Sequence, residues 1–186
     1  MINSILFDGH DALFKKVLAD SKVYGEYGCG QSTLWVLENT DCPVIAVDTS
    51  KDWVDRVLSK ASRECDLKHV DLGPVGGWGR PTGYSKKDDF HLYTDYLWKS
   101  DKNIDTVLID GRFRVCCFLT TIKYSKEGTS IIFDDYTNRH YYHEVEKYVK
   151  REDSHGRQCL FITPPKEKLD MESLDSDILK YRNVMD

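Results

Sequence analysis

Four short apolar runs, separated by segments with helical periodicity, are the feature of this sequence that most restricts its fold. The runs are Val44–Val47, Thr106–Ile109, Ser130–Phe133 and Cys159–Ile162. A strand with one face in water alternates between apolar and polar residues, whereas these runs are almost continuously apolar and predict a sheet covered on both faces. Helices between the strands provide such cover, so the pattern predicts a doubly wound, mostly parallel α/β sheet with right-handed crossovers.

The helices themselves are predicted from the spacing of apolar residues. The expected helices cover Ala12–Leu18, Leu34–Glu38, Lys51–Ala61, Asp89–Lys99, Arg114–Tyr124 and Tyr141–Val149, and a weaker one covers Leu169–Tyr181. Ser32 or Thr33 is the expected cap of the second helix, and Ser50 is the expected cap of the third, because their hydroxyls can accept from free amides at a helix start.

Turn residues complete the prediction. A weaker strand, Leu67–Val70, follows the third helix, and Gly156 predicts the turn of a C-terminal antiparallel hairpin that continues into 157–163. The chain length fits one domain, with its core at about 12–163 and a charged tail at 164–186. We therefore predict one Rossmann-like, doubly wound domain that ends in an antiparallel hairpin.

Composition excludes several classes of partner. The net charge of the chain is −5 and no basic cluster is present, which argues against a nucleic acid partner. No apolar run approaches the ~20 residues of a membrane span. The six cysteines form no C-x-x-C motif and no targeting pattern precedes them, so we expect reduced thiols in a cytoplasmic protein with no membrane partner.

The segment Val23–Thr33 joins an apolar strand to a helix start through a glycine turn, and it points to a nucleoside-bearing ligand. Gly28 and Gly30 fit the first two positions of the dinucleotide pattern G-x-G-x-x-G, but Thr33 occupies the third. Glu26 would be repelled by a diphosphate and attracted by an α-amino group. This favours S-adenosylmethionine over a dinucleotide; a tight turn and capped helix without any ligand is the other alternative.

Acidic residues follow most of the predicted strands, at the edge of the sheet where ligands of open α/β folds bind. They are Glu26, Asp48, Asp71, Asp110, Asp134 and Asp135. Asp48 can accept hydrogen bonds from ribose hydroxyls. Oxygen ligands such as the last three acids suit magnesium, manganese or calcium rather than zinc. The alternative is that these acids cap helices or pair with Arg112, Arg114 and Arg139.

Other residues near the same edge are candidates for catalysis and substrate contact. His140 or His143 could act as general base for a hydroxyl, although surface histidines beside tyrosines are common. Arg112 and Arg114 could hold a phosphate or carboxylate of the substrate. The segment 71–83 contains five glycines and two prolines around Trp78, so it is either a functional loop or a mobile connection.

From Val23 to Thr163 the chain resembles class I S-adenosylmethionine-dependent methyltransferases. Gly25–Gly30 resembles the first motif of that superfamily, Asp48 resembles its second acid, and Asp71 resembles the residue that commonly approaches the adenine. By this resemblance the cofactor site consists of Glu26, Gly28, Gly30, Ser32, Thr33, Asp48, Asp71 and Asp110.

The pairing of Ile109–Gly111 with Phe133–Tyr136 is similar to metal-dependent sugar O-methyltransferases that act on macrolide and aminocoumarin antibiotics. That resemblance implies Mg²⁺ or Mn²⁺ held by Asp110, Asp134 and Asp135. Those enzymes commonly carry an Asp or His after the Asp-Gly pair, whereas Arg112 follows it here. The same motifs also look like glycan-modifying methyltransferases of large algal viruses, for which the compartment would be the host cytoplasm.

The function expected from these residues is S-adenosylmethionine-dependent O-methylation of a sugar hydroxyl in a glycan or glycoside. Asp110, His140 and Arg112 are the expected catalytic residues. The partners are then a sugar or glycan acceptor and an associated glycosyltransferase domain. Two alternatives stay open, namely a catechol- or phenol-type O-methyltransferase and a catalytically inactive cofactor-binding module; a dehydrogenase is a third.

Overall fold

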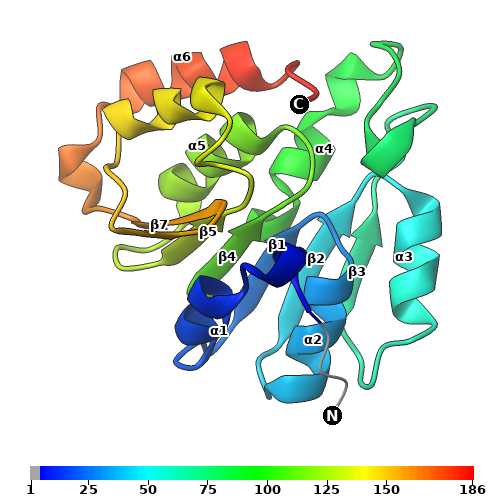
Figure 1. Cartoon of the computed structure of the whole chain (residues 1–186). Coiled ribbons are helices and arrows are strands. Elements are labelled where there is room, and N and C mark those ends of the chain that lie inside the picture. Colours follow the sequence, from blue (N-terminus) through cyan, green and yellow to red (C-terminus); the bar gives the residue numbers. More distant parts are fainter. Residues whose placement is uncertain (1–4) are drawn as a thin grey trace.

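The computed structural model describes residues 5–186, and its centre is a seven-stranded sheet in the order β3-β2-β1-β4-β5-β7-β6 (Figure 1). The strands are β1 (Tyr24–Tyr27), β2 (Val44–Asp48), β3 (Asp66–His69), β4 (Thr106–Ile109), β5 (Ser130–Phe133), β6 (Asp153–His155) and β7 (Gln158–Ile162). The first five are parallel, whereas β7 is antiparallel to β5 and β6 is antiparallel to β7. The predicted fold class, with its C-terminal hairpin, is confirmed.

Helices cover both faces of this sheet (Figure 1). The α-helices are α1 (Ala12–Leu18), α2 (Gln31–Asn39), α3 (Lys51–Leu58), α4 (His91–Thr94), α5 (Arg114–Tyr124) and α6 (Met171–Tyr181). Short 3₁₀ helices cover Phe7–Gly9, Gly77–Gly79, Lys87–Asp89, Tyr96–Lys99, His140–Lys147 and Lys166–Lys168. Among residues 5–186, no helix has both the length and the apolar character that crossing a membrane requires.

The two largest hydrophobic clusters, which lie on opposite faces of the sheet, explain why the central strands are apolar throughout. Successive side chains of a strand point to opposite faces of the sheet. Leu108 of β4 packs in the core that contains α1 and α2, whereas Val107 and Ile109 pack in the core that contains α5 and α6. Both faces of the strand are therefore buried, and a charge introduced on either face would be removed from water.

The predicted helix Asp89–Lys99 is interrupted, and a tyrosine is the reason. The hydroxyl of Tyr27 donates to the carbonyl of Thr94 at 2.6 Å, so this carbonyl already has a donor that does not belong to the helix. The amide of Trp98 instead donates to Asp95, and its indole Nε1 donates to the Tyr27 oxygen at 2.9 Å. A short α4 and a 3₁₀ helix replace the long helix.

Three further boundaries differ from the predictions. The expected helix Tyr141–Val149 is a 3₁₀ helix, and α3 ends at Leu58 rather than at Ala61. Helix α2 begins at Gln31 with Gly30 as its cap, so the expectation that Ser32 or Thr33 caps it is wrong. The expected cap of α3 is confirmed, because the Ser50 hydroxyl accepts from the amide of Trp53 at 3.4 Å.

Candidate functional site

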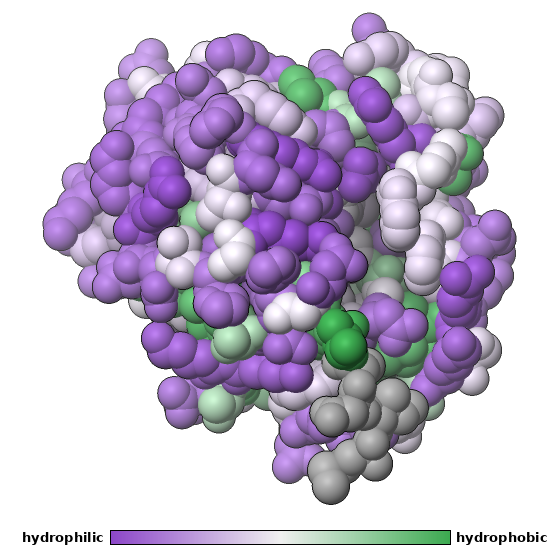
Figure 2. Space-filling model, viewed as in Figure 1, coloured by the Kyte–Doolittle hydropathy of each residue, from purple (hydrophilic) through white to green (hydrophobic). Residues whose placement is uncertain are grey.

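A cavity of about 590 Å³ lies at the carboxyl ends of the parallel strands. It is lined by the turns that follow β1, β2 and β4, which lie where the strand order reverses between β1 and β4. Open α/β sheets bind ligands at such a switch point, and the volume falls within the ~300–1,000 Å³ of small-molecule sites. Figure 2 shows a largely hydrophilic face that is hollowed to the right of its centre.

Two glycines bring the turns after β1 and β4 into contact. Gly28 has a φ of 90°, and a Cβ there would lie 2.6 Å from the Cα of Gly111. A Cβ on Gly111 would in turn lie 2.8 Å from the nitrogen of Gly28 and still closer to the Tyr93 hydroxyl. No other residue fits this approach, which places Asp110 directly beside the glycine turn. Gly28 and Gly30 both line the cavity, as expected.

Glu26 lies in the sheet beneath the glycine turn and is completely buried. Its carboxylate accepts from the hydroxyl of Ser32 and from that of Thr33, the latter at 2.6 Å. Burial raises the pKa of Glu26 to about 8, although both hydroxyls lower it. Ser32 lines the cavity, whereas Glu26 and Thr33 do not contribute to its lining. Glu26 is thus positioned to act on a ligand through Ser32.

Asp48 points into the cavity at the end of β2, as the sequence predicted. One carboxylate oxygen accepts from the amide of Cys29 at 2.9 Å, and the other accepts from the amide of Ser50 at 2.7 Å. Burial raises the pKa of Asp48 despite these bonds. Beside it, the rings of Trp53 and Trp78 stack with a centroid distance of 6.2 Å, and both line the cavity. The sequence had singled out Trp78 but not Trp53.

The three acids predicted to bind a metal do lie together. One oxygen each from Asp110, Asp134 and Asp135 lies within 4.8 Å of the others. Asp134 is fully buried, whereas Asp110 and Asp135 line the cavity. Burial, together with the charge of Asp134, raises the pKa of Asp110 to about 7, although the charge of Arg114 lowers it.

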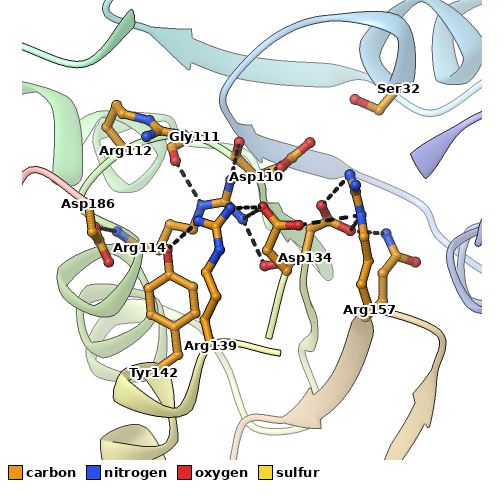
Figure 3. A network of polar contacts seen from close by, with 12 residues as sticks. Ser32, Asp110, Gly111, Arg112, Arg114, Asp134, Arg139, Tyr142, Arg157 and Asp186 are labelled. Carbon is orange, nitrogen blue, oxygen red and sulfur yellow. Dashed lines mark hydrogen bonds and ion pairs between the residues drawn. The ribbon is translucent and has the colours of Figure 1, made fainter. Parts of the chain in front are cut away.

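Three arginines surround these acids (Figure 3). Arg114, which is 2% exposed, pairs with Asp110 at 3.1 Å and with Asp135 at 3.4 Å. Arg139 pairs with Asp135 at 2.7 Å, and Arg157 pairs with Asp134 at 2.7 Å. We call these six residues the Asp–Arg network. It contains three carboxylates and three guanidinium groups, so its charges balance.

Arg157 and Asp8 extend this network to the N-terminal segment. Nη1 of Arg157 lies 2.8 Å from Asp8, and both residues line the cavity. Neither residue was predicted as part of the site, because Asp8 lies in a segment without a motif and Arg157 follows a hairpin glycine far along the chain. Only the pairing of β7 with β5 shows that Arg157 lies beside Asp134.

Besides the buried Glu26, Thr33 and Asp134, two further expected site residues, Asp71 and His140, lie outside the cavity lining. Asp71 pairs with Lys86 at 2.5 Å and accepts from the amide of Gly73, so its carboxylate is engaged on the surface of the loop. His140 is exposed and packs against His143, whose ring stacks on Tyr136. The structure brings neither residue to Asp110, and their functional roles stay predictions.

Comparisons with known proteins agree with this architecture. No family model matches the sequence, and no curated protein matches it either. A methyltransferase-like protein from Silicibacter pomeroyi has a TM-score of 0.81 at 26% identity, over 92% of this chain and 92% of that chain. An O-methyltransferase from Bacillus cereus in complex with S-adenosylhomocysteine has a TM-score of 0.53 at 14% identity, over 81% and 77%.

A third structure, the N-methyltransferase NodS from Bradyrhizobium japonicum in complex with S-adenosylhomocysteine, has a TM-score of 0.52 at 12% identity, over 85% and 87%. The chain therefore has the Rossmann-like fold of methyltransferases. Because this fold serves both O- and N-methyltransferases, the fold by itself does not select the acceptor atom.

Proposed function

We propose that this chain is an S-adenosylmethionine-dependent O-methyltransferase that acts on a sugar hydroxyl of a glycan or glycoside. The observation that carries the proposal is the cavity, in which the glycine turn and Asp48 meet Asp110 at the switch point of the sheet. The similarity to the methyltransferase-like protein from Silicibacter pomeroyi supports it over nearly the whole chain. An associated glycosyltransferase that supplies the glycan is part of this proposal.

The donor end of the cavity, formed by Gly28, Gly30, Asp48, Trp53 and Trp78, suits a nucleoside. Asp48 can accept from ribose hydroxyls, and the flat faces of the two tryptophans can bound a base. The side chain of Glu26 fixes the hydroxyl of Ser32 below the same turn. The residues present therefore fit S-adenosylmethionine. When bound, this cofactor would supply a methyl group on a sulfonium sulfur, and the sulfur would keep the electron pair of the carbon–sulfur bond when that bond breaks.

Arg112 is the expected contact for a carboxylate of that cofactor or of the acceptor. Its side chain lines the cavity, and within the described part of the chain it forms no ion pair with an acid. A guanidinium group without such a partner retains its charge for a ligand and can bind a carboxylate with two parallel hydrogen bonds.

The acceptor end, formed by Asp8, Asp110, Asp135, Arg139 and Arg157, alternates acidic and basic side chains. Carboxylates accept hydrogen bonds and guanidinium groups donate them, so neighbouring hydroxyls of a sugar find both kinds of partner on one wall. A sugar presents several such hydroxyls and a phenol only one, so this polarity favours the sugar acceptor over a phenol. A catechol also has two neighbouring hydroxyls, and only acceptor profiling separates it from a sugar.

Asp110 is the residue we propose as the base. It is the acid that both lines the cavity and adjoins the glycine turn through Gly111, so a hydroxyl held beside the methyl group would be within its reach. It takes the proton of that hydroxyl as the oxygen attacks. Holding donor and acceptor in line can contribute ~7–11 kcal/mol toward the barrier, and a positioned base adds roughly 10²–10⁴-fold.

A divalent cation, which the resemblance implies on Asp110, Asp134 and Asp135, does not fit the charge state of this network. Each of the three acids is already paired with an arginine. The guanidinium groups already neutralise the three carboxylates, so a divalent cation would add net positive charge to a balanced cluster or would have to displace an arginine. The proposed reaction therefore has no step through a metal.

The proposal is tested by calorimetry with S-adenosylhomocysteine, followed by methyl transfer from labelled S-adenosylmethionine to a panel of acceptors. We expect binding, and transfer to glycans or glycosides. In Asp110→Asn we expect transfer to fall by roughly 10²–10⁴-fold while the dissociation constant of S-adenosylhomocysteine is retained.

The other outcomes separate the alternatives. Transfer restricted to catechols would establish the catechol- or phenol-type reading, and binding without transfer to any acceptor would establish an inactive cofactor-binding module. Tight binding of a nicotinamide dinucleotide without binding of S-adenosylhomocysteine would point to a dehydrogenase. Full transfer by Asp110→Asn would remove Asp110 as the base.

A further inference from the structure

We infer that Arg114, Arg139 and Arg157 take the place of a divalent cation, so that the Asp–Arg network excludes metal, and that Arg157 is the residue chiefly responsible. The acids of the network have the composition and the spacing of a cation site, with one oxygen each within 4.8 Å. What distinguishes the network from such a site is the position of the three guanidinium groups (Figure 3).

Arg157 covers both oxygens of the buried acid. Its Nε lies 3.1 Å from Oδ1 of Asp134, and its Nη2 lies 2.7 Å from Oδ2. The amide of Gln158 also donates to Oδ1 at 3.0 Å. Asp134 is 0% exposed, and its Oδ2 has the ion pair with Arg157 but no hydrogen bond, so a cation bound there would lie directly against this guanidinium group or displace it. In Figure 3, Arg157 lies on the side of Asp134 opposite to Arg114.

Arg114 cannot withdraw from the network. Three backbone carbonyls hold its guanidinium group, those of Gly111 at 2.9 Å, Asp134 at 2.7 Å and Asp110 at 3.2 Å. Its side chain is 3% exposed. A side chain anchored in this way keeps its charge beside Asp110, where it weakens cation binding, but it contacts only the backbone carbonyl of Asp134, whose carboxylate is paired with Arg157.

Asp135 is held in turn by three arginines. Oδ2 of Asp135 lies 2.7 Å from Arg139 and 3.4 Å from Arg114, while Oδ1 lies 3.6 Å from Nε of Arg157. The backbone of Asp135 has a φ of 57°, a left-handed conformation that side chains other than glycine rarely adopt. Ion pairs to both oxygens hold the carboxylate in this position.

The sheet order explains how Arg157 reaches the acids. Strand β7 runs antiparallel to β5, and Cys159 lies opposite Phe133 in the register. The residues just before Cys159 are therefore brought beside the residues just after Phe133, which are Asp134 and Asp135. The C-terminal hairpin thus places the guanidinium group of Arg157 beside the three carboxylates. This arrangement depends on β7 being antiparallel to β5.

One consequence concerns the acceptor, and it rests on the proposed function. Without a metal, two neighbouring oxygens of the acceptor need not be chelated, so an acceptor with one free hydroxyl can serve. Hydrogen bonds from Arg139 and Arg157, whose side chains are 36% and 26% exposed, would then orient the acceptor. Metal binding itself can be measured without any acceptor, so the two proposals fail separately.

The test uses Mn²⁺ alone, titrated into the full chain and followed by the electron paramagnetic resonance signal of the free ion. We expect no saturable binding by the wild-type protein. Arg157→Met keeps much of the side-chain volume but removes the charge, and we expect it to gain one Mn²⁺ site, with affinity raised by roughly tenfold or more because one source of repulsion is gone. Arg157→Met/Asp134→Asn should lose that gain.

Lys16→Met is the matched control. Lys16 forms a surface ion pair with Asp153, with 3.3 Å between the charged atoms, and neither residue lines the cavity. This variant should bind no more Mn²⁺ than the wild type. Saturable binding of one Mn²⁺ by the wild type that disappears in Asp134→Asn would overturn the proposal. So would a folded Arg157→Met protein without any gain. If Arg157→Met does not fold, Arg139→Met, at a more exposed position, replaces it. A gain of one Mn²⁺ site in that variant would support the proposal, and a folded variant without the gain would overturn it.

Discussion

The donor end and the acceptor end of the cavity are built in different ways. The donor end is formed mainly by backbone groups. Gly28 and Gly111 permit the close approach of two turns, and the amides of Cys29 and Ser50 donate to Asp48. At the acceptor end, long side chains from distant segments meet, such as Asp8, Arg139 and Arg157. The donor end therefore depends on local conformation, and the acceptor end depends on the balance of buried charge.

The largest expected effect comes from breaking the acceptor end at Arg114. Arg114→Met removes a buried charge from between Asp110 and Asp135 and leaves both acids without it. Breaking a buried pair of this kind costs about 3–5 kcal/mol, which urea unfolding would measure as lost stability. Lys51→Met, which breaks the exposed pair with Asp55, should cost less than ~1 kcal/mol. Equal losses in the two variants would contradict the distinction.

Breaking the donor end requires only a methyl group. In Gly28→Ala the new Cβ would lie 2.6 Å from the Cα of Gly111, at a φ of 90°. Overpacking and left-handed strain together should cost about 2–4 kcal/mol of unfolding free energy. Gly30→Ala is the control, because a Cβ on Gly30 meets nothing within 4 Å. Comparable stabilities for the two variants would show that the two turns need not touch.

The buried Glu26 below the donor end should make the free energy of unfolding depend on pH. The pKa of Glu26 is about 8 in the folded chain and near 4.5 when unfolded, so the folded state holds the proton more tightly. The stability that this group contributes is complete below about pH 4.5 and is lost as the pH rises through about 8. Relative to Glu26→Gln, wild-type stability should fall by up to about 1.4 kcal/mol for each pH unit in this window. Parallel urea-unfolding profiles between pH 5.5 and 7.5 would argue against a protonated Glu26.

The smallest expected effect concerns the tryptophan stack, and it depends on the proposed cofactor. Trp78 is 77% exposed, so Trp78→Ala should leave folding almost unchanged. Losing one stacking face should weaken binding of S-adenosylhomocysteine by about fivefold, or ~1 kcal/mol, as calorimetry would show. Tyr84→Ala, in the same stretch of chain but outside the cavity lining, should bind normally. If Trp78→Ala binds S-adenosylhomocysteine with unchanged affinity, the tryptophan stack does not contact the cofactor.

The difference between the two ends also explains which parts of the site were predictable. The strands Thr106–Ile109 and Ser130–Phe133 were predicted to the residue, because burial on both faces leaves a continuous apolar signal. The meeting of Asp110 with Asp134 and Asp135 followed from the rule that parallel strands end at one edge. The interrupted helix after Asp89 was not predictable, since it depends on the hydroxyl of Tyr27 from another strand.

The sequence by itself determined the doubly wound sheet, the glycine turn, and the acids at its edge, because these depend on local periodicity and on the direction of the strands. Only the tertiary structure decided what those acids bind. Arg157 lies 23 residues beyond Asp134 in the chain and reaches it because β7 is paired antiparallel with β5. Charge balance inside a protein is set by such long-range neighbours, and no local pattern in the sequence records them.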